Sequence, residues 1–171
     1  MQKNFSYPLI VEDIASSEKQ YHLEATPSEL SELAEILQIP SVKSFIANIS
    51  TKLHKKEHML HVWGEVTAEL ELQSVISLEY FTKTYHPEFK LVYDTKATLN
   101  TSKEEELDFA EEMPDIVIDG QIDLGQIAIE QVALEMEDYP RKDGEVFRWQ
   151  SEFDTDEIKN NPFQILEKLK K

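Results

Sequence analysis

The 171-residue chain holds 34 acidic and 17 basic residues, a formal charge of −17, which excludes a broad phosphate-binding face and leaves only local or indirect contact with nucleic acid. It has no cysteine, which excludes disulfides, thiolate metal sites and a cysteine nucleophile. The N-terminal residues 1–8 contain no apolar run of signal-peptide length, and no segment approaches the roughly 20 apolar residues that span a bilayer. We therefore expect a cytoplasmic protein without membrane contact, with one domain over residues 1–171.

The first quarter of the chain predicts two strands and a helix. Apolar residues alternate with polar ones over 5–11 and again over 21–25, which is the period of a strand with one buried face. Thr26, Pro27 and Glu29 then form a helix start, because a threonine cap and a glutamate three residues later can satisfy each other's backbone N–H groups. Apolar residues at helical spacing continue this helix to Pro40.

An antiparallel meander is predicted over residues 42–93. Residues 45–53 and 60–72 keep a period of two around a polar turn at 54–57, which indicates a hairpin with one buried and one solvated face. A third strand over 81–93 would complete the meander. Pro87 limits that strand to a sheet edge or a bulge, because proline cannot donate to the ladder.

The second half predicts an acidic loop and a central helix. Residues 94–115 have many glutamates and little periodicity, so we expect a mobile acidic loop. Asp123 predicts the cap of a helix, with Gln126 reaching back as in a capping box, and Pro140 ends the helix near Tyr139. Its apolar surface is wide, extending to Leu134, which favours burial against a sheet.

Residues 151–171 are predicted to be a C-terminal tail, in which Asn161, Pro162 and Phe163 begin a short helix. The fold class expected from these elements is α+β. It is an antiparallel sheet or a partly closed barrel packed by one central helix, with an early helix and a short C-terminal helix.

The residues give no catalytic, cofactor or metal site. Phosphate-loop, serine-hydrolase and zincin motifs are all missing, and the many carboxylates single out no acid–base pair. His54, His58 and His61 are the nearest metal candidates. His58 and His61 would face opposite sides of one strand and a turn separates His54 from both, so we interpret all three as solvated polar residues.

Aromatic and cationic residues give two candidate contact sites for a partner or RNA. Trp63 falls on the polar face of its strand, where it can stack on a base or a partner, or be covered by a loop or helix. The only two arginines, Arg141 and Arg148, lie close to Lys142, Tyr139 and Phe147. This combination suits phosphate or interface contacts, and it equally suits pinning the segment to an acidic sheet.

At these residues the sequence resembles the YceD family of large ribosomal RNA subunit accumulation proteins, and in particular its alphaproteobacterial-type branch. The first block is Trp63-Gly64-Glu65-Val66-Thr67-Ala68-Glu69-Leu70, followed by Ser74 to Glu79. The second is Ile122-Asp123-Leu124-Gly125 with Glu130, Leu134, Tyr139-Pro140-Arg141-Lys142, Gly144 and Phe147. The third is Asn161-Pro162-Phe163 with Leu166 and Leu169-Lys170.

The resemblance assigns a structural role to the family-motif residues Gly64, Asp123, Leu124, Gly125, Glu130, Pro140, Gly144, Asn161, Pro162 and Phe163. Many relatives carry one or two cysteines in the first block, where this chain has Ser74 and Ser77. A thiol or metal role at those positions therefore cannot be carried over.

The resemblance implies a non-enzymatic ribosome-biogenesis factor, needed for synthesis, processing or stability of large-subunit (23S) ribosomal RNA. It would bind the pre-ribosomal large subunit, either directly through rRNA or through basic ribosomal proteins, and needs no cofactor. One alternative is a general acidic adaptor or chaperone for basic proteins. Another is a metal-dependent nuclease using clustered carboxylates. The oligomeric state is left open.

Overall fold

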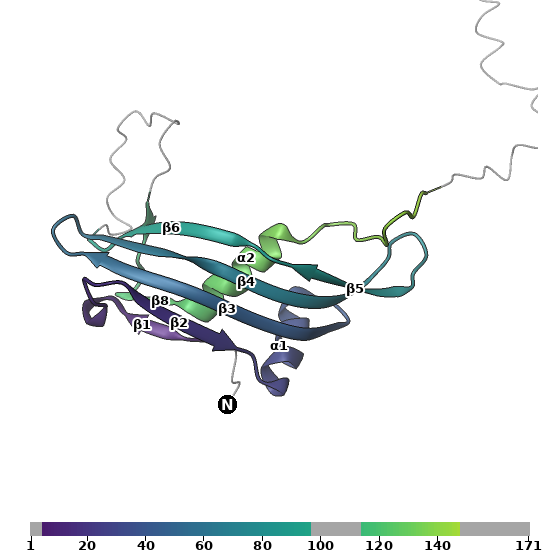
Figure 1. Cartoon of the computed structure of the whole chain (residues 1–171), viewed down its shortest axis with the longest axis horizontal. Helices are drawn as coiled ribbons and strands as arrows, with labels where there is room; N and C mark the ends of the chain where they lie inside the picture. Colours follow the sequence, from purple (N-terminus) through teal and green to yellow (C-terminus); the bar gives the residue numbers. More distant parts are fainter. Residues whose placement is uncertain (1–4, 97–113, 148–171) are drawn as a thin grey trace, which may run out of the picture.

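A computed structural model describes residues 5–96 and 114–147 (Figure 1). In chain order the elements are β1 (Pro8–Ile10), the 3-10 turn η1 (Val11–Asp13), β2 (Lys19–Glu24), α1 (Pro27–Leu37), β3 (Ser41–His54), β4 (Met59–Gln73), β5 (Tyr80–Tyr85), β6 (Glu88–Asp94), β7 (Asp115–Ile116), β8 (Gln121–Asp123) and α2 (Leu124–Glu135). The described chain is thus α+β, with a six-stranded, mainly antiparallel sheet and a separate two-stranded sheet.

The long hairpin β3–β4 is the centre of the sheet, as the period of two predicts. The strands pair from Ser41↔Glu71 down to His54↔Met59, with one irregularity near Val42. Along β4 every second residue from Leu60 to Leu72 is buried except Gly64. The hairpin therefore has one core face and one outer face.

The predicted third strand is confirmed, but it is broken in two. β5 and β6 both pair antiparallel with β4, on the edge opposite β3. They are separated at His86 and Pro87, where the Val66 N–H still donates to the Pro87 carbonyl at 3.0 Å. Since Pro87 has no N–H of its own, the strand must break at this point.

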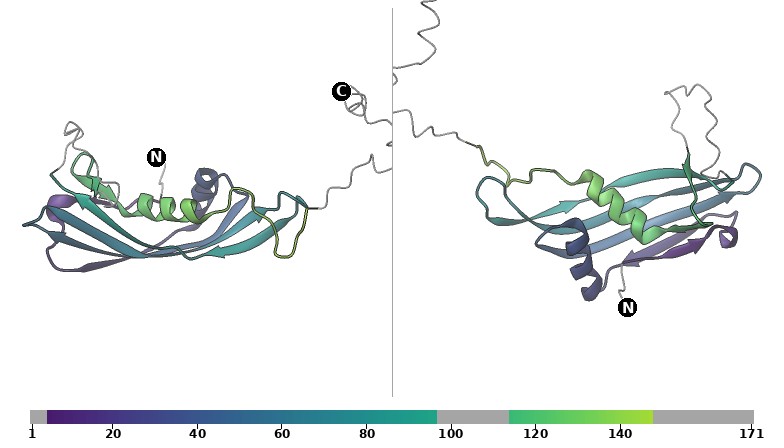
Figure 2. Two further views of the ribbon diagram at one scale, coloured as in Figure 1. Left: turned by 90° about the horizontal axis from the view of Figure 1, so that it is seen from above. Right: turned by 180° about the vertical axis from the view of Figure 1, so that it is seen from behind.

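The sheet is open, so the expectation of a partly closed barrel is wrong. The strand order is β2-β3-β4-β6-β7, with β5 paired only to β4, and within the described residues β2 and β7 form opposite edges. Alternation in a sequence decides which side chains face the core and says nothing about whether two edges meet. The core is closed instead by both helices, which lie on the same concave side of the sheet (Figure 2).

Helix α1 begins with the predicted capping box. The Thr26 side chain accepts from the Glu29 N–H, and the Glu29 carboxylate accepts from the Thr26 N–H at 2.8 Å. The helix ends where Gln38 adopts the left-handed conformation, two residues before Pro40. Leu33 is fully buried and fixes the helix on the sheet.

Helix α2 is capped by Asp123, as predicted. The carboxylate accepts from the backbone N–H groups of Gly125 at 2.8 Å and Gln126 at 3.1 Å. The helix packs against β4 across the concave face, and three of its side chains, Leu124, Ala128 and Val132, have no exposed surface. Burial against a sheet is thereby confirmed.

Three details of α2 differ from the prediction. The Gln126 amide donates to Glu130 at 3.2 Å instead of reaching back to the cap. Leu134 is 80% exposed, because only one side of the helix meets the sheet. The helix ends at Glu135, earlier than expected, because Met136 turns the chain towards β5, where Glu137 pairs with Lys83 at 2.6 Å.

The first predicted strand is shorter than expected, and parts of two other predicted elements lie outside the described residues. The predicted strand over 5–11 is reduced to β1, which pairs with β8 beside the start of α2. The ends of the predicted acidic loop belong to β6 and β7, and its residues 97–113 lie outside the described residues. The predicted tail and helix over 151–171 also lie outside them.

Candidate functional site

The outer face of the sheet carries the first candidate site. Odd-numbered residues of β4, among them His61, Trp63 and Glu65, point away from the core. Neither described helix covers this face, since both lie on the opposite side (Figure 2). Trp63 is half-buried at the position that the sequence predicts, and the alternative that a helix covers it does not hold for the described residues.

A hollow of about 670 Å³ surrounds Trp63. We call it the Trp63 pocket; it is lined by Asn48, Lys52, His54, His61, Trp63, Gly64, Glu65, Glu88, Phe89 and Lys90. The residues come from β3, β4 and β6, so the pocket exists only when these three strands are paired in the observed register.

Two lysines lie on either side of the indole. Lys90 of β6 pairs directly with Trp63, and Lys52 of β3 pairs with His61, one outer-face position along β4. Across β4 the two flanking strands are about 10 Å apart, which is twice the strand spacing. Among the described residues neither Lys52 nor Lys90 forms an ion pair. Both ammonium groups are therefore available to an anionic ligand.

His54 and His61 lie in contact, contrary to the expectation that the turn separates them. Their ring centroids are 4.8 Å apart at an interplanar angle of 64°. The hairpin register explains this, since His54 pairs with Met59 and is thereby a diagonal neighbour of His61 on the outer face. His58 instead occupies the turn with a φ of 56°.

The His61 pKa is lowered from its ordinary value, first by burial and then by the neighbouring His54 and Lys90. The imidazole is therefore mainly neutral at pH 7, and it offers an aromatic surface more than an extra charge. A phosphate bound beside it would raise its pKa again.

A polar chain crosses the outer face next to the pocket. His22 bonds Asn48 at 2.7 Å, the Asn48 amide donates to Glu65 at 3.2 Å, and His86 lies 3.4 Å from the other Glu65 oxygen. Ligand atoms of Glu65, His86 and Glu88 all lie within 4.8 Å of one another. Imidazole and carboxylate groups suit a divalent cation such as Zn²⁺, so these three residues are the ones in the described structure that could hold one.

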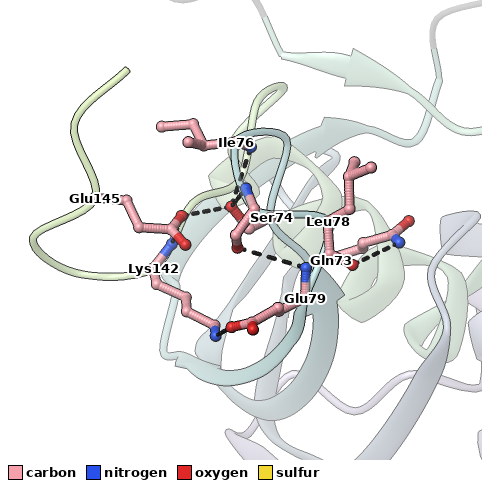
Figure 3. A network of polar contacts seen from close by, with 8 residues as sticks. Gln73, Ser74, Ile76, Leu78, Glu79, Lys142 and Glu145 are labelled. Carbon is pink, nitrogen blue, oxygen red and sulfur yellow. Dashed lines mark hydrogen bonds and ion pairs between the residues drawn. The ribbon is translucent and has the colours of Figure 1, made fainter. Parts of the chain in front are cut away.

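The second predicted site follows α2. Tyr139 and Phe147 are 77% and 67% exposed. The Arg141 side chain is exposed and forms no ion pair with a described residue. Lys142, in contrast, pairs with Glu79 on the β4–β5 loop (Figure 3). Arg148 lies outside the described residues.

The segment over residues 139–147 is fixed to the β4–β5 loop by a hydrogen-bonded clasp. We define the clasp as Ser74, Pro140, Lys142 and Glu145. The Val75 N–H donates to the Pro140 carbonyl at 2.9 Å. The Ser74 hydroxyl donates to the Glu145 carboxylate (Figure 3). Ser74 is fully buried. Hydrogen bonds from Ser74 and then Ser77 lower the pKa of Glu145, so the carboxylate stays ionised while the clasp is formed.

Two of the family-motif glycines lie where two backbones come close together. A Cβ at Gly64 would be 2.1 Å from the Asn48 carbonyl oxygen of β3, and one at Gly125 would be 2.4 Å from the Phe5 carbonyl oxygen. Gly144 has a φ of 81°, in the region that favours glycine. Asp123 accepts from the Tyr7 N–H as well as from α2, which joins the N-terminal segment to the helix.

The other family-motif residues have various positions. Leu124 is fully buried, Glu130 is exposed and bonds Gln126, and Pro140 belongs to the clasp. Asn161, Pro162 and Phe163 lie outside the described residues.

The structure does not bring the two predicted sites together. The hollow beside residues 136–145 is lined by Lys83 and that segment, and it shares no residue with the Trp63 pocket. The sequence did not indicate Lys52 and Lys90 as site residues, and it did not indicate that the rings of His54 and His61 are in contact. Cross-strand register could have indicated them, since all four occupy outer-face positions beside Trp63.

Among the described residues no helix is long and apolar enough to cross a membrane. No curated protein and no solved structure matches the chain. A protein-family model described as large ribosomal RNA subunit accumulation protein YceD matches residues 62–170, which is more than half of the chain and includes Trp63, Lys90, α2 and the clasp. The chain therefore belongs to the YceD family, which is named for an accumulation factor of large-subunit ribosomal RNA.

Proposed function

We propose that this protein is a non-enzymatic ribosome-biogenesis factor of the cytoplasm, which promotes accumulation of 23S rRNA by binding precursors of the large ribosomal subunit. The supporting observation is the Trp63 pocket, an aromatic side chain on an open sheet face between two lysines that form no ion pair with a described residue. The family name connects the chain to large-subunit rRNA, and the pocket offers a surface suited to binding.

Two surfaces would contact the precursor. The first is the outer face at Trp63. The second is the exposed segment with Tyr139, Arg141 and Phe147, continued by Arg148; Lys142 contributes by holding the segment through Glu79. The contact can be made to rRNA directly or through a basic ribosomal protein held on the acidic surface.

We also propose that the chain belongs to the alphaproteobacterial-type branch of the family. Its absence of cysteines supports this assignment, with Ser74 and Ser77 at the positions where many relatives have them. In this chain the Ser74 hydroxyl acts as a hydrogen-bond donor to Glu145, a role that needs no thiol chemistry.

Depletion of the protein from growing cells tests the proposed function. The expected result is a selective fall in large-subunit rRNA relative to small-subunit rRNA, measured on total RNA and restored by re-expressing the chain. An unchanged ratio after complete depletion would contradict the proposal, because a factor needed for large-subunit accumulation cannot be removed without that loss.

The charge of −17 favours one second candidate, a general acidic adaptor for basic proteins. The composition of a pull-down separates the two functions. Large-subunit proteins together with precursor rRNA support the biogenesis factor, whereas an unselective set of basic proteins without precursor rRNA supports the adaptor.

A further inference from the structure

We infer that the Trp63 pocket binds unpaired RNA directly, with a base stacked on the Trp63 indole and the adjacent phosphates held by Lys52 and Lys90. This inference rests on the proposed function and deepens it, since it names RNA, and specifically single-stranded RNA, as the partner of the outer face.

The argument begins with the position of the indole. Trp63 lies at the centre of three paired strands, between Ser50 on β3 and Lys90 on β6. A small side chain on one flank leaves room beside the ring, and the partly exposed Trp63 side chain lies on a sheet face that neither described helix covers. Aromatic rings on an open sheet face are a common platform for base stacking in single-stranded nucleic acid binding.

The distribution of charge favours RNA over a basic protein. Lys52 and Lys90 flank Trp63 and neither is neutralised by an ion pair among the described residues. A basic peptide entering the pocket would meet both ammonium groups, whereas a phosphate on either side of a stacked base would be attracted to them. Glu65 and Glu88 pair at one end of the pocket, and Lys52 and His54 lie towards the other end. The RNA strand should therefore leave the pocket in the direction of Lys52 and His54.

The large negative charge does not prevent this contact. At 0.1 M salt the Debye length is about 10 Å, so charges on distant parts of the surface are largely screened from a ligand in the pocket. The charged side chains nearest to the ligand are then two lysines and two glutamates, and the two glutamates lie together. Because the rings of His54 and His61 are in contact with each other next to Trp63, a neighbouring base has another ring to pack on.

Duplex RNA should bind poorly at this site. Its bases are already stacked inside the helix and cannot reach an indole on a sheet surface. The geometry thus predicts a preference for single strands that is independent of sequence, since every base has a face that can stack.

The test uses the full-length chain carrying Trp149→Phe, so that Trp63 is its only tryptophan. A 12-nucleotide oligoadenylate is added, and indole fluorescence and the anisotropy of a labelled oligonucleotide are both measured. Quenching of Trp63 that saturates together with the anisotropy supports the inference. The same oligonucleotide annealed to its complement should bind more weakly.

Variants identify the groups responsible. Trp63→Ala should weaken binding about 5- to 150-fold, and Trp63→Phe should restore much of it, because stacking is the lost interaction. Lys52→Gln with Lys90→Gln should lower the slope of log affinity against log salt by about 1.4 for two phosphate contacts. The matched control Lys19→Gln with Lys96→Gln removes the same charge from outside the pocket and should leave the slope nearly unchanged.

The outcomes separate the inference from the proposed function. If Trp63→Ala binds the oligonucleotide as the parent does, or if the chain does not bind it while still co-sedimenting with precursor particles, the RNA inference is overturned and the proposed function stands. Quenching of Trp63 by a basic ribosomal peptide but not by RNA also overturns it. If the parent chain itself does not co-sediment with precursor particles, this result counts against the proposed function.

Discussion

At the scale of single residues, Gly64 decides how closely the two central strands approach. Its missing side chain lets the β3 backbone lie where a Cβ would be 2.1 Å from the Asn48 oxygen and 2.9 Å from the Ile49 Cα. Both atoms belong to the backbone and cannot move as a flexible side chain can. The residue also lines the pocket directly after Trp63, so this close approach supports the proposed binding surface.

Gly64→Ala should therefore destabilise the protein by about 1–3 kcal/mol, as overpacking of a well-filled site does. Urea unfolding followed by circular dichroism measures the change. Glu69→Ala is the control, because Glu69 is exposed on the same strand and its replacement should stay within about 0.5 kcal/mol. Equal midpoints for the two variants would show that the hairpin tolerates a side chain at position 64.

The sequence predicted some residues of the candidate site and missed others for one physical reason. Alternation along β4 was enough to place Trp63 on the outer face. Lys52 lies on β3 and Lys90 on β6, so both become neighbours of Trp63 on β4 only through the register of the three strands. Register depends on the turn and on packing of the whole core, which a local pattern does not contain.

At the scale of elements, local signals predicted what local chemistry decides. The capping box of α1, the cap of α2 and the β3–β4 hairpin are all confirmed. The predicted end of α2 was wrong, because contacts with distant parts of the chain determine where the helix ends. Glu137 pairs with Lys83 on β5 and the Pro140 carbonyl accepts from Val75, so the chain leaves the helix early to reach both partners.

The clasp gives an element-scale prediction about pH. Hydrogen bonds from Ser74 and Ser77 lower the pKa of Glu145 below 4.5, so the unfolded chain takes up this proton at a higher pH than the folded one. The stabilising contribution is present above the unfolded pKa and is lost as the pH falls through the folded value. The attachment of residues 140–145 to the β4–β5 loop should weaken in the same pH range.

A carbon-13 titration of the Glu145 carboxyl group measures this pKa. The parent chain should give a midpoint below the ordinary glutamate value, and Ser74→Ala should raise it, because the largest cause of the shift is removed. Glu69 in the same spectra serves as a reference carboxyl group outside the clasp. The clasp would be refuted as the cause if Ser74→Ala left the midpoint of Glu145 where it was.

At the scale of the whole molecule, the sheet has two faces with different tasks. The concave face carries both helices (Figure 2) and packs the core. The outer face carries the Trp63 pocket and the polar chain beside it. Because the sheet does not close on itself, the two helices and not further strands cover its concave face. An overall charge of −17 confines contact with RNA to a local surface.

The central claim, that large-subunit rRNA accumulates through binding at the outer face, is tested most directly in cells whose only copy of the chain carries Trp63→Ala. With the variant present at the parent's level, we predict a fall in the ratio of large-subunit to small-subunit rRNA, and Trp63→Phe should largely restore the ratio. A ratio equal to that of the parent in the Trp63→Ala cells would contradict the account.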